Sequence, residues 1–270
     1  MANEEKEKAL NWRNKYKARM NVDGSKMIKG LHYEETYAPV VQWATIRFFI
    51  SMATLSNRHT RQLDFVLAYT QADIERDLYM KLPAGFTMPG RTITEQDRKD
   101  YVLKLEKNLY GQKQARRVWY LHLRKNLLKL GFKPSQHDEC VFYYGKTVFI
   151  VYTDDTILLG PDKDEIDLLV KRLSKSFKIE DQGDLSDYLG IKIERKPDGT
   201  LEWTQPTLTQ SILKDLKLDR EEIKGRQNKP NIKPIPAHTS VPLTDHRDSP
   251  DHNPKDFEYH QVIGKLLVSI

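Results

Sequence analysis

Apolar residues recur along the chain with two different spacings, which predicts a mixture of helices and strands. Helical spacing runs through residues 41–55, 118–130 and 163–177, so each of these segments is expected to form a helix with one buried face. Residues 205–218 open with a proline near the first turn and predict another helix. Gly131 follows the second segment and is expected to end that helix.

Short runs rich in β-branched and aromatic residues, bounded by turn residues, predict the strands. They are expected at residues 59–67, 77–82, 140–144 and 147–152, in two strands around a turn within 16–29, and in a hairpin formed by 188–195 and 200–204. The polar residues 87–99 predict a surface loop, and residues 225–258 a long connector. This order of elements favours an α+β sheet domain with helices on one face over a parallel doubly wound fold.

Composition narrows the class of protein. The chain has 270 residues, of which 39% are hydrophobic and 30% charged, so it can build a sizeable core. It has no apolar run long enough to span a bilayer, and because residues 1–17 are charged without an apolar core we do not expect them to act as a secretory signal. The single cysteine fits a reducing compartment, and the net charge of +6 suits a polyanionic partner. The last residues are apolar, so we expect a fragment of a longer protein.

Two adjacent aspartates, Asp154 and Asp155, lie between two apolar runs that predict a hairpin. One interpretation is ordinary turn chemistry, because aspartate bonds its own backbone in turns. The other is a cation site, because paired carboxylates repel each other and a divalent cation removes that cost. Asp64 lies in a further apolar strand and is either a helix N-cap or part of the same site. Together the three carboxylates suit two-metal phosphoryl transfer.

Seven short motifs follow one another along the chain. They are Lys17-Ala18-Arg19, Glu35-Thr36-Tyr37-Ala38-Pro39-Val40, Gln62-Leu63-Asp64, Leu78-Tyr79-Met80 with Pro83-Ala84-Gly85-Phe86, Leu109-Tyr110-Gly111-Gln112-Lys113-Gln114-Ala115 with Trp119, Tyr152-Thr153-Asp154-Asp155, and Leu189-Gly190-Ile191. In this order they resemble the reverse transcriptase of copia-type LTR retrotransposons, over roughly residues 15–270. The chain departs from the family pattern at four positions. Thr153 replaces Val, Gln112 replaces Leu, Arg116 replaces Pro, and Asp23 stands where related sequences often carry a basic or neutral residue.

The resemblance implies an RNA-directed DNA polymerase with a right-hand fold and an antiparallel palm sheet. Residues 1–62 with 80–115 would form the fingers, 63–79 with 116–204 the palm, and 205–270 the truncated start of a thumb. Asp64 and Asp154 would bind two Mg²⁺ ions, for which Mn²⁺ could substitute. Asp155 would be the third carboxylate, and the main-chain carbonyl of Phe65 would complete one coordination sphere.

The resemblance also implies roles around the three carboxylates. Tyr69 would lie beneath the incoming sugar, or else be a core aromatic. Lys17 and Arg19 would meet the triphosphate, or else form a solvated strand face. Lys113, Arg116, Arg117 and Tyr152 would follow the nucleic acid, with Trp119 expected in the core rather than as a stacking platform.

The implied partners are an RNA or DNA template–primer and dNTPs, with integrase and RNase H portions expected in the same polyprotein. The implied location is a cytoplasmic virus-like particle, and the nucleus as well. A catalytically silent, nucleic-acid-binding remnant of such an element is the alternative, and the intact carboxylates speak against it.

Overall fold

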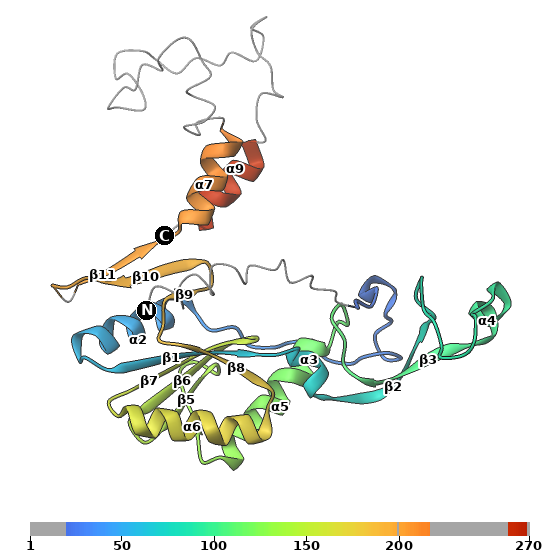
Figure 1. Cartoon of the computed structure of the whole chain (residues 1–270), viewed down its shortest axis with the longest axis horizontal. Coiled ribbons are helices and arrows are strands. Elements are labelled where there is room, and N and C mark those ends of the chain that lie inside the picture. Colours follow the sequence, from blue (N-terminus) through green and yellow to red (C-terminus); the bar gives the residue numbers. More distant parts are fainter. Residues whose placement is uncertain (1–19, 199, 217–258, 269–270) are drawn as a thin grey trace, which may run out of the picture. The chain divides into compact units, whose positions relative to one another are not determined.

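The structure is a computed structural model of the chain, and it describes residues 20–198, 200–216 and 259–268. Lys17 and Arg19 lie outside these residues, as does the connector expected at 225–258. The chain divides into two compact units, Met1–Asp184 and Leu185–Ile270. Figure 1 labels most of the elements of both units along the chain.

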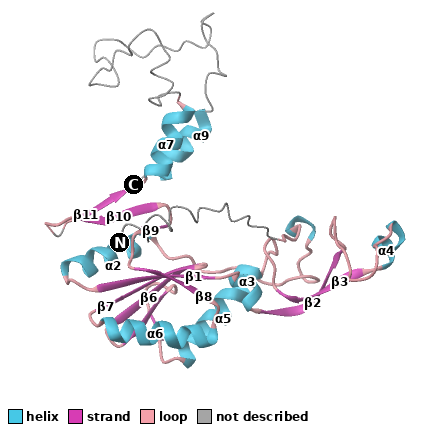
Figure 2. Cartoon of the chain, in the orientation of Figure 1, coloured by secondary structure: helices cyan, strands magenta, loops and turns pink. Residues whose placement is uncertain are grey.

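A six-stranded sheet forms the centre of the first unit (Figure 2). Its strands are β1 (His59–Phe65), β4 (Lys133–Pro134), β5 (Val141–Tyr144), β6 (Thr147–Tyr152), β7 (Asp155–Gly160) and β8 (Ile179–Gly183), in the order β4-β5-β6-β7-β1-β8. Every neighbouring pair is antiparallel. Antiparallel sheets combined with helices confirm the predicted α+β class.

Helices cover both faces of this sheet. On one face, Phe65 packs against Trp119 of α5 (Ala115–Lys129) and against Phe177, which follows α6 (Lys163–Ser176). On the other face, Phe49 of α2 (Trp43–Leu55) contacts Tyr143. The expectation of helices on one face was therefore wrong. The physical reason is that β6 is buried along nearly its whole length, so neither face can be left to water.

A second, two-stranded sheet joins β2 (Asp73–Lys81) to β3 (Val102–Lys107), with α4 (Glu95–Asp100) between the strands in sequence. Strand β2 begins four residues before its predicted start. The stretch predicted as a loop contains α4, because Thr94 and Asp97 cap each other's backbone at its first turn. A short helix, α3 (Ala68–Gln71), links β1 to β2.

The two strands predicted within 16–29 are absent from the described part of that segment. Instead, residues Gly24–Lys26 form a 3₁₀ turn, η1. The Asp23 carboxylate accepts a hydrogen bond from the Ser25 amide at 3.2 Å, which ends the extended backbone at that point. Strands β3 and β8 were not predicted, because their sequences are too polar to show a strand pattern.

The second unit contains a three-stranded sheet of β9 (Asp187–Tyr188), β10 (Ile191–Arg195) and β11 (Leu201–Thr204). The hairpin of β10 and β11 confirms that prediction. Helices α7 (Pro206–Asp215) and α9 (Tyr259–Val268) pack together, and Lys265 donates to Ser211 Oγ at 2.7 Å and pairs with Asp215. In the described residues, no helix combines the length and apolarity that crossing a membrane requires.

Candidate active site

The strand register brings two of the three predicted carboxylates side by side. Asp64 on β1 is the direct partner of Asp155 on β7, and Asp155 is the partner of Tyr152 on β6. Residues directly opposite each other in antiparallel strands share a face, with Cβ atoms about 5 Å apart. Tyr152, Asp155 and Asp64 therefore form one row across three adjacent strands.

Asp154 lies at the tip of the hairpin between β6 and β7, next to this row. Only Thr153 and Asp154 connect the two strands, and Thr153 has a φ of +61°. A β-branched residue rarely adopts that conformation, so the turn needs outside support. Trp119 Nε1 donates to the Thr153 carbonyl at 2.7 Å, and Arg116 donates to Thr153 Oγ1 at 2.9 Å. The Phe65 amide, at the end of β1, donates to the Asp154 carbonyl at 3.0 Å.

Arg116 and Thr153 are two of the four positions at which the chain departs from the family pattern, and their side chains are hydrogen-bonded to each other. A hydrogen bond to a charged donor contributes about 1.5–3 kcal/mol. We expect a double-mutant cycle of Arg116→Ala and Thr153→Val to show a coupling of about 1–2 kcal/mol in the free energy of unfolding, measured in urea. Additivity of the two single changes within about 0.5 kcal/mol would contradict this prediction.

Burial and neighbouring charges change the pKa of Asp155, the third carboxylate. Burial, and then the charges of Asp154 and Asp64, raise the pKa of Asp155 to about 6. These causes show that the three carboxyl groups interact electrostatically. Such a group is held partly protonated near neutral pH, and its ionisation destabilises the fold.

This raised pKa predicts a pH dependence of stability. An unfolded aspartate has a pKa of about 3.9, so the folded protein binds the extra proton between that pH and about 6. The contribution of Asp155 to stability is therefore present below pH 4 and is lost as pH rises toward 6. One pKa unit corresponds to about 1.4 kcal/mol, and solvent screening reduces this for a half-buried group.

In metal-free buffer, we therefore expect Asp155→Asn to raise the stability at pH 7.5 by about 1 kcal/mol, or about 3 °C in Tm. At pH 4.5 the difference in Tm between Asp155→Asn and wild type should be smaller than at pH 7.5. Asp100→Asn, which removes an exposed carboxylate on α4, is the matched control and should show no such pH-dependent difference. A Tm difference between Asp155→Asn and wild type that does not change with pH would contradict the prediction.

The donor chemistry of the row fits a divalent cation, because carboxylate oxygens are the ligands that magnesium prefers. Burial first, and then repulsion by Asp154 and Asp64, raise the pKa of Asp155, and a bound cation would offset both effects. Within the described ranges, however, no group of three or more His, Cys, Asp or Glu side chains is already arranged to hold a metal ion. The carboxylates are neighbours in the fold, and their side chains would have to reorient for their oxygens to bind a common ion.

Tyr69 lies on α3, the short helix that follows β1, and is half-buried. Burial raises its pKa; Arg116 acts against this shift, and Asp154 adds to it. Its ring contacts that of Tyr110 at a centroid distance of 4.6 Å. Tyr69 is thus brought near the hairpin tip rather than into the core.

The predicted nucleic-acid residues differ in their surroundings. Lys113 is exposed and lies over the ring of Tyr33, 5.5 Å from its centroid. Arg117 lies 3.8 Å from Glu75, and Arg116 is engaged with Thr153. Trp119, only 1% exposed, is a core residue as expected.

Sequence reasoning missed two residues beside the site. Gln71 donates to the carbonyls of Val66 and Lys178 at 2.9 Å each and accepts from the Lys178 amide at 2.8 Å, so it joins the end of β1 to the start of β8. Glu180 on β8 is the partner of Asp64, so the row continues onto a fourth strand and gains a further carboxylate. No local signal identifies either, because both depend on the position of β8.

Comparison with known proteins supports one family. The family model described as reverse transcriptase (RNA-dependent DNA polymerase) matches residues 3–225. The Pol polyprotein of transposon RE2 from Arabidopsis thaliana is 34% identical over 94% of this chain, and that of transposon TNT 1-94 from Nicotiana tabacum is 34% identical over 86%. The chain spans only 16% of the length of each.

A more distant relative is the Gag-Pol polyprotein of transposon Ty1-ER2 from Saccharomyces cerevisiae, 29% identical over 61% of this chain and 10% of its own length. Among solved structures, a telomerase from Candida albicans covers 70% of this chain and 39% of its own, with 12% identity and a TM-score of 0.34, too low to support any statement about fold. The family match covers well over half of the sequence. This chain therefore belongs to the reverse transcriptase family of RNA-dependent DNA polymerases, in its copia-type retrotransposon branch.

Proposed function

We propose that this chain transfers deoxynucleotidyl groups from dNTPs onto the 3′ hydroxyl of a primer and releases pyrophosphate, as the polymerase portion of a longer Pol polyprotein. The observation that carries the proposal is the register partnership of Asp64 and Asp155, with Asp154 at the adjacent hairpin tip. It supports a site where several carboxylates act together, which a turn aspartate or a helix N-cap does not explain. Asp64 in particular lies within β1, not at the start of a helix.

Asp64, Asp154 and Asp155 would hold two Mg²⁺ ions, with Mn²⁺ as a substitute, and the main-chain carbonyl of Phe65 would add a ligand. Bound there, the ions would activate the attacking hydroxyl and stabilise the leaving oxygen. The protein's own part is to hold the hairpin in place, through Trp119 and the end of β1. Arg116 stabilises the same turn by donating a hydrogen bond to the hydroxyl of Thr153.

Other residues would bind and orient the substrates. The ring of Tyr69 would lie beneath the sugar of the incoming nucleotide, a role supported by its place on α3, half-buried and in contact with the ring of Tyr110. Lys17 and Arg19 would contact the triphosphate. Lys113, Arg116, Arg117 and Tyr152 would contact the template–primer, although Arg116 would do so only in addition to its bond with Thr153.

The right-hand division is part of this proposal. Residues 63–79 and 116–204, which hold most of the six-stranded sheet with α5 and α6, would be the palm, and residues 1–62 with 80–115, which hold β3 and α4, would be the fingers. The start of a thumb would follow residue 204. The contact pattern divides the chain after Asp184, so β9–β11 lie in the second unit although the sequence-based division places them with the palm.

The partners of the whole polyprotein would be an RNA or DNA template–primer and the integrase and RNase H portions. Its location would be a virus-like particle in the cytoplasm, and the nucleus.

Primer extension on poly(rA)–oligo(dT) with dTTP and Mg²⁺ tests the proposed function, with the same labelled strands examined for cleavage. Extension that requires a divalent cation is the expected result. Template–primer binding without extension, in the presence of Mg²⁺ or Mn²⁺, would instead support a silent nucleic-acid-binding remnant. Cleavage without extension would indicate a nuclease.

A further inference from the structure

The segment between β1 and β2 carries Tyr69, and little within the segment itself holds that residue in place. Helix α3 is a single turn of four residues, and a helix this short has little stability of its own. Leu67, at its N-cap, has a φ of +52°, which costs free energy for a residue with a Cβ. Ala68 and Ala72 are fully buried, but each packs only a methyl group. The position of Tyr69 therefore depends on bonds to neighbouring elements.

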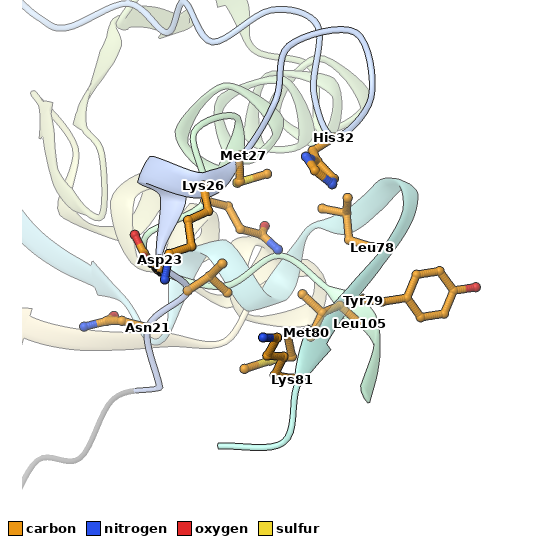
Figure 3. A pocket seen from close by; sticks show the side chains of 12 residues that line it. Asn21, Asp23, Lys26, Met27, His32, Leu78, Tyr79, Met80, Lys81 and Leu105 are labelled. Carbon is orange, nitrogen blue, oxygen red and sulfur yellow. Dashed lines mark ion pairs between the residues drawn. The ribbon is translucent and has the colours of Figure 1, made fainter. Parts of the chain in front are cut away.

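Strand β2, which follows α3, gives this helix weak support. Its register with β3 shifts between Asp73 and Leu78, so the two strands are not continuously paired at the end nearer α3. Farther along, β2 borders a cavity of about 340 Å³, and Figure 3 shows the side chains of Leu78 and Met80 among those that line it. Hydrogen bonds that reach α3 from other elements must therefore contribute much of its rigidity.

One side chain of α3 bonds to the backbone of two neighbouring segments. Gln71 Nε2 donates to the carbonyls of Val66 and Lys178 at 2.9 Å each, and its Oε1 accepts from the Lys178 amide at 2.8 Å. The same Lys178 carbonyl accepts from the Val66 amide at 3.0 Å. Both N–H groups and the oxygen of the Gln71 amide are thus used, and the reverse orientation would set its oxygen against two carbonyls. These partners fix the side chain in one orientation.

This arrangement connects the strand of Asp64 to the helix of Tyr69. Val66 lies two residues after Asp64, and Lys178 lies directly before β8, which pairs with β1. Gln71 lies two residues after Tyr69 on the same helical turn. Loss of the Gln71 amide would therefore free the Tyr69 ring to move relative to the row of carboxylates.

A second amide holds the same end of the helix from another side. Asn108 is fully buried, and its Nδ2 donates to the carbonyls of Ala72 and Asp73 at 3.2 and 2.9 Å. It lies two residues before Tyr110, whose ring contacts that of Tyr69. This amide fastens α3 to the segment of Tyr110, whereas the glutamine fastens it to the strands of the carboxylates.

We propose that Gln71 is a positioning residue for sugar selection, because its amide sets the place of the Tyr69 ring relative to Asp64. The inference rests on the proposed function, in which Tyr69 lies beneath the sugar and Asp64 binds the metal ions. Steric rejection of an added 2′-hydroxyl depends on how closely the ring approaches the sugar. A displacement of about 1 Å in an active site can cost on the order of a hundredfold in rate. Gln71 acts through Tyr69 and does not contact the substrate.

Gln71→Met replaces the amide by an apolar side chain of similar length and removes all three bonds. The ratio of kcat/KM for dCTP to that for CTP should fall at least about threefold, mainly through easier incorporation of CTP. In a Tyr69→Val background the same change should leave the ratio unaltered, because the ring through which Gln71 acts is gone. Thr45→Val removes a hydrogen bond between α2 and Asp138 and is the control for lost stability. It should lower Tm without changing the ratio.

A measurement without substrate separates the position of Tyr69 from polymerase activity. The whole chain is labelled with fluorotyrosine, and the fluorine NMR resonance of Tyr69 is assigned by its loss in Tyr69→Phe. Gln71→Met should shift or broaden this resonance and leave those of Tyr143 and Tyr144, on β5, in place. If Gln71→Met does not fold, Gln71→Glu takes its place, since it keeps the acceptor for the Lys178 amide and loses both donated bonds.

A moved Tyr69 resonance supports the positioning role even if wild type extends no primer, a result that would contradict the proposed function alone. An unmoved resonance overturns the inference. So does an unchanged ratio for Gln71→Met in a chain that extends primers. An equal fall of the ratio with and without the Tyr69 ring overturns it as well, because Gln71 would then not act through Tyr69.

Discussion

Asp154→Asn is expected to reduce primer extension by at least about a thousandfold, because ion-mediated stabilisation supplies several kcal/mol of the barrier reduction. Asparagine keeps the size of the side chain but cannot carry the negative charge that a divalent cation requires. The hairpin should survive the change, since its hydrogen bonds reach the backbone of Thr153 and Asp154 and not the carboxylate of Asp154. The measurement is single-nucleotide incorporation under single-turnover conditions.

Template–primer affinity of the same variant should be unchanged or slightly higher. One negative charge is removed beside a polyanion, while the cations that bind phosphate remain. Asp100→Asn removes an equal charge from α4 and should retain full activity. A wild-type rate for Asp154→Asn would exclude the proposed metal role, whatever the effect on binding.

Tyr69→Val is expected to admit ribonucleotides at least about tenfold more readily, a loss of about 1.4 kcal/mol in discrimination. A site can reject an added 2′-hydroxyl only by steric exclusion or by burying it without a partner. The Tyr69 ring is half-buried against Tyr110 and near Asp154, where a sugar beneath the reacting phosphate would lie. Valine would leave this space open.

The discrimination is measured as the ratio of kcat/KM for dCTP to that for CTP, in variant and wild type. The rate with dCTP should fall less in Tyr69→Val than in Asp64→Asn. Tyr101→Val replaces an exposed tyrosine beyond α4 and serves as the control. An unchanged ratio in Tyr69→Val would return this residue to a packing role.

Local patterns predicted the long, strongly periodic elements well. Helix α2 and helix α6 match their predicted segments within a few residues, because each shows one apolar face over more than ten positions. The hairpin of β6 and β7 was likewise visible from two apolar runs around Asp154 and Asp155. Short or polar elements such as α4, β3 and β8 escaped prediction, because caps and tertiary pairing rather than periodicity stabilise them.

The sequence by itself determined the family, the three carboxylates and the strands that carry them, because each depends on residue type and order along the chain. Only the tertiary structure decided that Asp64 faces Asp155, since register between strands distant in the sequence is set by packing on both sheet faces. The tertiary structure also decided that Arg116 holds the Thr153 turn. These contacts join segments distant in sequence, and no local pattern encodes them.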